Sequence, residues 1–359
     1  MKALPDHFWG ETEVAPGARA STSLLVSSSY FGADIRVPLV VWRGKAPGPT
    51  VAIIAAVHGD EINGTGIVRH IITEQPFELR KGTVVLAPVV NVLGFERLSR
   101  YLPDRRDLNR SFPGAKGGSL ASRMARSFFD HVIRRCDACI DLHTAAIRRT
   151  NFPNVRADMT SPEVAELARA FGAELIVNGK GPQGSLRRSA CAIGCRTIIL
   201  EAGEAWKVEP AVVEYATRGI SNTLAHLGMI KAKPIEPHYR IEASSTKWVR
   251  AKLGGFLQFH IAPGDFVAKG DPIATNTSIF GDNQNTLDAP RDGVVLGMTT
   301  MPAVAPGDPI CHLAFPTEAE AHALLGARAR LPESSLHERV RGDLARNIHV
   351  TEPAEEAPG

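Results

Sequence analysis

The chain has 359 residues, more than one hydrophobic core usually serves, so we expect two domains. Hydrophobic residues make up 44% and charged residues 22%, the balance of an ordinary globular protein, and the formal net charge of +3 is too small to indicate a nucleic-acid or membrane partner. The apolar runs are of strand length, far short of the roughly 20 residues that a membrane span needs.

The N-terminal segment 1–13 contains charged side chains and no apolar stretch, so we expect no secretory signal there. The chain has five cysteines, and the C-x-x-C pair Cys136 and Cys139 is not followed by a second pair at zinc-ribbon spacing. Buried thiols packed as apolar groups are therefore favoured over redox or metal chemistry. A reducing cytoplasm is the simplest location for such a chain.

From Thr50 to about Gly228, strand-like apolar runs alternate with segments of helical spacing. The expected strands are 51–57, 83–89, 138–142, 175–177 and 196–200, and the expected helices are 62–72, 120–134, 161–171 and 210–227. Alternation of this kind predicts an α/β fold with a layered sheet and helices on both faces.

The sequence changes character near Pro234 and Pro237, which suggest a linker. From 245 to 315 there is no helical period, and Pro-Gly-Asp turns recur, which predicts a small all-β barrel or sandwich. Beyond Pro316 a helical stretch leads into a tail rich in Glu, Pro and Ala, which we expect to be disordered. We divide the chain into an α/β domain (1–235), a β-barrel or sandwich domain (236–316) and a helical segment with its tail (317–359).

Metal-ligating side chains follow two of the expected strands. His58 and Glu61 come directly after strand 51–57, and His143 closes strand 138–142. Zinc binds imidazole and carboxylate groups, and a catalytic site needs three protein ligands and one open position. Carboxyl ends of strands meet at one edge of an open α/β sheet, and Asp141 there could orient a ligand imidazole. Each signal alone is also compatible with a surface loop or a hydrogen-bonded core histidine.

A further carboxylate, Glu201, ends strand 196–200 and is followed by small residues. At that edge it can take a proton from a water activated by zinc and pass it to a leaving nitrogen. The alternative interpretation is an exposed loop carboxylate, a description that suits Glu204. The segment 100–110 holds four arginines, whose planar groups match carboxylates. It could anchor an anionic substrate, or it could be a solvated charged loop.

Four motifs in order, His-Gly-Asp-Glu, Asp-Leu-Asn-Arg-x-Phe-Pro-Gly, Asp-Leu-His-Thr and Leu-Glu-Ala-Gly, resemble the succinylglutamate desuccinylase/aspartoacylase family. The resemblance runs from about Pro49 to Gly203, and the β-rich C-terminal part is similar to the barrel of these deacylases. It implies a three-layer α/β/α domain like that of the zinc carboxypeptidases, with a mixed sheet. The sequence is more similar to the bacterial deacylase branch, which includes enzymes that deacetylate N-acetyl-diaminobutyrate, than to the two enzymes that name the family.

The resemblance also implies roles for individual residues. The zinc ligands would be His58, Glu61 and His143, with one Zn²⁺ per chain, and the general acid/base would be Glu201. The scissile carbonyl would be polarised by Arg100, although Arg105 and Arg106 compete for that role. A substrate carboxylate would be bound by Asn109 and Arg110, with Arg187 of Gly184-Ser185-Leu186-Arg187 as a further contact.

The expected activity is zinc-dependent removal of an acyl group from a small N-acylated amino acid, an amide-bond hydrolysis. The alternatives are a metallocarboxypeptidase acting on peptides, with a wider cleft, and a catalytically silent binding protein that uses its barrel. A biotinyl or lipoyl carrier is disfavoured because the hairpin-like stretch 278–287 has no lysine. Neither nucleic acid nor membrane is expected as a partner, and a homo-oligomer is compatible with the sequence.

Overall fold

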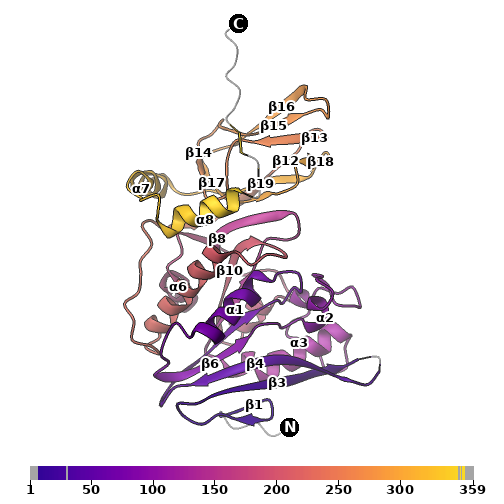
Figure 1. Cartoon of the computed structure of the whole chain (residues 1–359), viewed down its shortest axis with the longest axis vertical. Helices are drawn as coiled ribbons and strands as arrows, with labels where there is room; N and C mark the ends of the chain where they lie inside the picture. Colours follow the sequence, from indigo (N-terminus) through magenta and orange to yellow (C-terminus); the bar gives the residue numbers. More distant parts are fainter. Residues whose placement is uncertain (1–6, 30, 347, 349, 352–359) are drawn as a thin grey trace.

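The computed structural model describes residues 7–29, 31–346, 348 and 350–351, so the tail beyond 351 that was expected to be disordered lies outside the described residues. A mixed sheet of 13 strands runs through the molecule (Figure 1). Ten strands form its main path, in the order β12 (Thr246–Arg250), β19 (Pro309–Ala314), β17 (Gly293–Thr299), β8 (Arg149–Ala157), β10 (Arg196–Glu204), β7 (Ala138–His143), β5 (Ala46–Ala55), β6 (Lys81–Ala87), β4 (Asp34–Arg43) and β3 (Arg19–Ser28).

The shorter strands pair off this path. They are β9 (Leu175–Asn178), β11 (Ile241–Ala243) and β14 (Phe266–Val267), and a separate small ribbon joins β1 (Phe8–Trp9) to β2 (Thr12–Glu13).

The centre of the sheet is parallel, because β10 pairs with β7, β7 with β5 and β5 with β6 in the same direction. These strands are apolar on both faces, as strands covered by helices must be: residues 51–57 are all fully buried. The carboxyl ends of β5, β7 and β10 consequently meet at one edge of the sheet.

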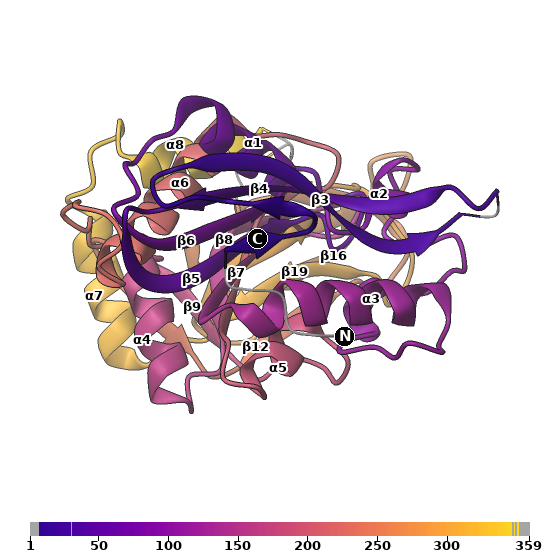
Figure 2. The same ribbon diagram turned by 90° about the horizontal axis from the view of Figure 1, so that it is seen from below.

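Helices cover both faces of this centre. On one face, α1 (Asn63–Glu74), α4 (Pro162–Phe171) and α6 (Pro210–His226) pack into a large apolar core. On the other, α3 (Leu120–His131) and α5 (Leu186–Cys191) pack into a second core. Figure 2 shows the sheet between the α1 and α6 side and the α3 and α5 side. The expected α/β/α layering with a mixed sheet is confirmed.

Helix ends follow ordinary local rules. The side chain of Ser119 accepts a hydrogen bond from Ser122 N at the start of α3, and α4 and α6 begin with proline, whose missing N–H costs nothing in a first turn. Gly172, in the left-handed region, ends α4. The remaining helical segments are α2 (Val92–Phe95), η1 (Leu108–Arg110), η2 (Ile133–Arg135), α7 (Glu318–Arg328) and α8 (Leu336–Ala345).

The C-terminal part contains the expected small β structure. A four-stranded antiparallel sheet, in the order β16 (Asn283–Asp288), β15 (Pro272–Thr277), β13 (Gly255–Phe259) and β18 (Ala303–Val304), encloses an apolar core together with β17 and β19. Because β17 also pairs with β8, the central sheet continues across the boundary predicted at 235/236. The pairing covers the edge that β8 would otherwise expose. The domain limits themselves stay a prediction.

None of the helices in the described part of the chain has the length and hydropathy that a membrane crossing requires.

Candidate metal centre and active-site pocket

The turn after β5 carries the first two predicted ligands. Ala56, with φ of 51°, bends the chain out of the strand, and Glu61 N donates to His58 O at 3.2 Å. Between them Gly59 lies against α2: a Cβ there would stand 2.0 Å from the carbonyl carbon of Gly94. Only glycine permits this approach, so Gly59 lets the turn that carries both predicted ligands pack directly against α2.

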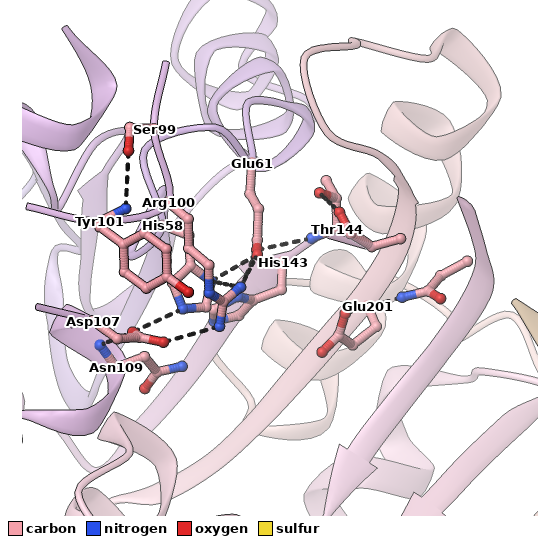
Figure 3. Close-up of polar contacts among 12 residues, drawn as sticks. His58, Glu61, Ser99, Arg100, Tyr101, Asp107, Asn109, His143, Thr144 and Glu201 are labelled. Carbon is pink, nitrogen blue, oxygen red and sulfur yellow. Dashed lines mark hydrogen bonds and ion pairs between the residues drawn. The ribbon is translucent and has the colours of Figure 1, made fainter. Parts of the chain in front are cut away.

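The third predicted ligand, His143, ends β7. The parallel register pairs Ala55 with Leu142, so His143 lies beside the turn that follows β5. The Nδ1 atoms of His58 and His143 each lie 2.7 Å from one oxygen of Glu61, Oε1 and Oε2 respectively (Figure 3). All three residues are buried, and their ligand atoms lie within 4.8 Å of one another.

This donor set fits a zinc ion. Two imidazoles and one carboxylate are the donors of a catalytic His₂Glu zinc site, which keeps one position open. Burial raises the pKa of Glu61, but His58 and His143 outweigh it and lower that pKa, so the carboxylate is charged. For His143, the carboxylates of Asp141 and Glu61 outweigh the effect of burial and raise the pKa. The carboxylates around this buried space favour a positive charge in it, so the space between the three side chains suits a divalent cation.

Two further carboxylates lie behind the imidazoles. Asp107 Oδ1 is 3.2 Å from His58 Nε2, and Asp141 Oδ2 is 3.0 Å from His143 Nε2. The second contact is an ion-pair distance without hydrogen-bond geometry. Asp141 lies behind His143 as expected, and its orienting role stays a prediction, whereas Asp107 was missed. Asp107 is the first residue of the motif Asp-Leu-Asn-Arg, in which binding roles were expected only for Asn109 and Arg110. Its position in that motif was the signal for a supporting carboxylate.

Glu201 lies beside the metal centre on the next strand, since the β10–β7 register pairs it with His143. Its Oε2 accepts a hydrogen bond from Asn151 Nδ2 at 3.1 Å, and its Oε1 lies 3.6 Å from Arg156 Nε. The competing carboxylate, Glu204, bonds Lys207 and Thr300 and does not line the pocket. The structure therefore places Glu201, and not Glu204, in the pocket beside the predicted metal ligands.

Of the arginines in segment 100–110, Arg100 reaches the metal centre. Its Nη1 lies 3.3 Å from Glu61 Oε1, and its Nη2 donates to Asp107 Oδ2 at 3.0 Å. By contrast, Arg105 and Arg106 are exposed and do not line the pocket. Of the three candidates for the carbonyl-polarising role, Arg100 is the one that contacts the predicted metal ligands, and its role stays a prediction.

The predicted carboxylate-binding residues line the same pocket. Asn109 is buried, and its Oδ1 accepts from Leu186 N at 2.9 Å, which ties η1 to the start of α5. Arg187, 6% exposed, has no hydrogen-bond partner for Nε and Nη1 among the described residues. Arg110 is more exposed, and its Nη1 donates to Asn109 O at 2.7 Å.

All eight predicted site residues line one pocket of about 300 Å³. A larger and mostly apolar groove of about 980 Å³ between α1 and α6 contains none of them. The pocket also has lining residues that sequence reasoning did not single out: Arg149, Asn151, Arg156, Trp248 and His312. The first three come from β8, where a cluster of basic and amide side chains soon after His143 was an available signal. The last two come from the C-terminal β region, where no motif marks them.

Comparisons with known proteins agree with this arrangement. Residues 47–227 match the family profile of the succinylglutamate desuccinylase/aspartoacylase catalytic domain. The N-alpha-acetyl-L-2,4-diaminobutyric acid deacetylase of Halomonas elongata is 27% identical over 300 residues, which cover 80% of this chain and 87% of that protein.

Solved structures show the same fold. The product-bound ectoine utilization protein EutE (DoeB) from Ruegeria pomeroyi superposes with a TM-score of 0.72 at 22% identity, over 87% of this chain and 97% of that one. A succinylglutamate desuccinylase/aspartoacylase from Rhodobacter sphaeroides gives 0.71 at 23% identity, over 83% and 96%. The profile spans half of the chain and contains every predicted site residue, so this protein belongs to the succinylglutamate desuccinylase/aspartoacylase family.

Proposed function

We propose that this protein is a zinc-dependent amidohydrolase that removes the acyl group from an N-acylated amino acid or a similar small carboxylate. One observation carries the proposal: the buried group of His58, Glu61 and His143 converges on one point beside Glu201, in a pocket lined with arginines. Family membership supports it, as does the relative named for deacetylation of an acetylated diaminobutyric acid.

The metal would be held by His58, Glu61 and His143, one ion per chain. When bound, zinc would supply a Lewis acid that lowers the pKa of the attacking water. Glu201 would take a proton from that water and deliver it to the leaving nitrogen. Asn151 and Arg156 would hold the Glu201 carboxylate in place at the pocket, because they contact its two oxygens.

Arg100 would act on the substrate carbonyl. Its guanidinium is anchored by Asp107, and Nη1 reaches the oxygen of Glu61 on the metal side of the pocket. A cation fixed there would stabilise negative charge that develops on the carbonyl oxygen during attack. The α-carboxylate would be bound by Asn109 and Arg110 together with Arg187.

Pocket size favours a small substrate over a peptide. The volume of about 300 Å³ is at the lower end of small-molecule sites, and side chains from the C-terminal β region close one side. A silent binding protein is disfavoured because the proposed ligands, acid/base and arginines are all present and all line one pocket.

The test is release of primary amine from a panel of N-acetyl amino acids, compared with dipeptides and longer peptides, by zinc-loaded protein. Glu201→Gln is the control for contaminating activity, and Glu204→Gln is the matched variant outside the pocket. We expect N-acetyl amino acids to be cleaved by the parent and by Glu204→Gln. Faster cleavage of peptides would establish a carboxypeptidase, and no cleavage of any substrate would overturn the proposal.

A further inference from the structure

The segment that follows Glu201 lies outside the pocket, and the proposed mechanism assigns it no role. We call residues 203–209, which end β10 and lead into α6, the brace loop. The structure describes the whole loop, and none of its residues lines the pocket. Its first residue, Gly203, is nevertheless the last residue of the motif Leu-Glu-Ala-Gly. Contact with substrate or metal therefore does not account for this part of the motif.

The brace loop contacts both segments that carry predicted metal ligands. Gly203 O accepts a hydrogen bond at 3.1 Å from Ala145 N, two residues after His143. Trp206 N donates at 2.9 Å to the carbonyl oxygen of Asp60, which lies in the turn between the other two predicted ligands. The sheet register already places the end of β10 beside β7, but this turn follows the end of β5 and has no such register. The brace loop thus ties the turn to the end of β10.

The same loop reaches the segment that carries Arg100. The indole Nε1 of Trp206 donates to Leu98 O at 3.1 Å, two residues before Arg100. The Trp206 backbone has φ of 63°, a left-handed conformation that a non-glycine residue keeps only where its surroundings hold it. Its two hydrogen bonds, through the backbone N and through Nε1, hold it against the turn after β5 and against this segment.

A buried pair of side chains anchors the loop. Asn63, the first residue of α1, lies two residues after Glu61, and its Nδ2 donates to Glu209 Oε2 at 2.6 Å. Its Oδ1 accepts from Glu209 N at 3.0 Å, and the same Glu209 oxygen also accepts from Glu204 N at 3.1 Å. Both side chains are buried, so loss of either would leave buried polar groups without a partner. The pair therefore joins the start of α1 to both ends of the brace loop.

Gly203 lies directly against this pair. Its φ is 75°, and a Cβ there would stand 1.9 Å from Glu209 Oε2 and 2.3 Å from Asn63 Nδ2. Any side chain would push into the two hydrogen-bonded groups. The glycine that ends the motif is thus explained by the anchor of the loop.

We infer that Asn63 and Glu209 are positioning residues, which act through the brace loop to hold Glu201 at a set place relative to the turn that carries His58 and Glu61. The inference rests on the proposed function and adds two residues that line no part of the pocket. Asn151 and Arg156 contact the Glu201 carboxylate itself, whereas the brace loop places the strand end that carries it.

The main variant is Glu209→Ala, which leaves Asn63 Nδ2 and Glu204 N without their acceptor. We expect kcat on an N-acetyl amino acid to fall by ~10–100-fold with KM and zinc content unchanged, because a small displacement of a catalytic group costs rate and not binding. Glu209→Gln should restore most of kcat, since its amide oxygen can accept both hydrogen bonds.

The matched control is Glu174→Ala, which removes another buried carboxylate, hydrogen-bonded to Tyr215 and outside the pocket. It should lower Tm and leave kcat unchanged. Losses of kcat in Glu209→Ala and Asn63→Ala should not add in the double variant, because each removes one side of the same contact.

Hydrogen exchange gives a readout that does not depend on turnover. In Glu209→Ala the amides of Trp206 and Ala145, which form the contacts of the brace loop, should exchange faster, and in Glu174→Ala they should not. If Glu209→Ala does not fold, Trp206→Phe takes its place, since this half-exposed side chain loses only its bond to Leu98. Its kcat should fall at unchanged Tm and zinc content.

An unchanged kcat in Glu209→Ala or in its substitute, a loss confined to KM, or an equal loss in Glu209→Gln would overturn the inference. If the parent cleaves no N-acyl amino acid, the proposed function fails. The exchange comparison then still tests the anchor, and unchanged exchange at Trp206 and Ala145 would refute it.

Discussion

The metal centre and the wall formed by Arg149, Trp248 and His312, called the seam wall below, line one pocket and are built in different ways. At the metal centre the Glu61 carboxylate has four protein contacts, from His58, His143, Arg100 and the backbone N–H of Thr144. At the seam wall Arg149 lies over the Trp248 ring, with the Asp308 carboxylate nearby. The first arrangement is held by hydrogen bonds and ion pairs to one carboxylate, whereas the second is held by stacked rings under a guanidinium.

The largest effect is expected from breaking the metal centre. His58→Ala or His143→Ala removes one of three proposed ligands, so zinc occupancy should fall from one ion per chain to near zero, with loss of turnover. Elemental analysis of freshly purified protein measures it. His312→Ala is the matched control, since this histidine lines the same pocket from the seam wall and should leave zinc in place. Full occupancy in either ligand variant would contradict the site.

Glu201 separates proton transfer from metal binding. Glu201→Gln keeps the shape of the side chain and its contact with Asn151, so fold and zinc content should be unchanged. Turnover should fall by a factor of ~10²–10⁴, the usual contribution of a positioned acid/base. Steady-state kinetics with metal analysis checks both points. A variant as active as the parent would remove Glu201 from the mechanism.

The metal centre and the seam wall also differ in how well the sequence predicts them. The metal centre depends on β5, β7 and β10, whose unbroken apolar runs identify them as buried parallel strands. Each run is followed at once by a proposed ligand or acid/base residue, so sheet geometry brings His58, His143 and Glu201 together.

The seam wall depends on pairings between strands far apart in the chain. Trp248 and His312 reach the pocket only because β17 pairs with β8 and β19 pairs with both β17 and β12. No local pattern encodes this register. Strands β3 and β4 were missed for a related reason: polar residues alternate with apolar ones along them, and half-covered strands of this kind carry a weaker signal than buried ones.

Replacing Asp107 tests whether the carboxylates behind the proposed metal ligands contribute to metal affinity. Asp107→Asn removes the charge that contacts His58 Nε2 and anchors Arg100, while keeping the size of the side chain. Loss of such a supporting contact typically weakens metal affinity by ~10–100-fold. Competition against a chelator of known affinity measures the change. Unchanged affinity would show that His58 is held well enough by the Gly59 turn alone.

The smallest effect is expected at the binding site of the substrate α-carboxylate. Its measurement shows which arginine binds this group. Arg110 is proposed to bind this group together with Asn109. A hydrogen bond to a charged group contributes roughly 1.5–3 kcal/mol. Arg110 is partly solvated, so Arg110→Ala should lower kcat/KM by about tenfold, at the lower end of that range.

Replacing the substrate carboxylate by an amide should have a similar cost. Because each change removes one side of the same contact, the two losses should not add in a cycle of parent and Arg110→Ala on an N-acyl amino acid and its amide. Additive losses would mean that Arg110 touches another part of the substrate. Buried Arg187, whose Nε and Nη1 have no partner among the described residues, would then be the better anchor. A repeat of the cycle with Arg187→Gln and Arg149→Gln would show whether Arg187 or the seam wall holds the carboxylate.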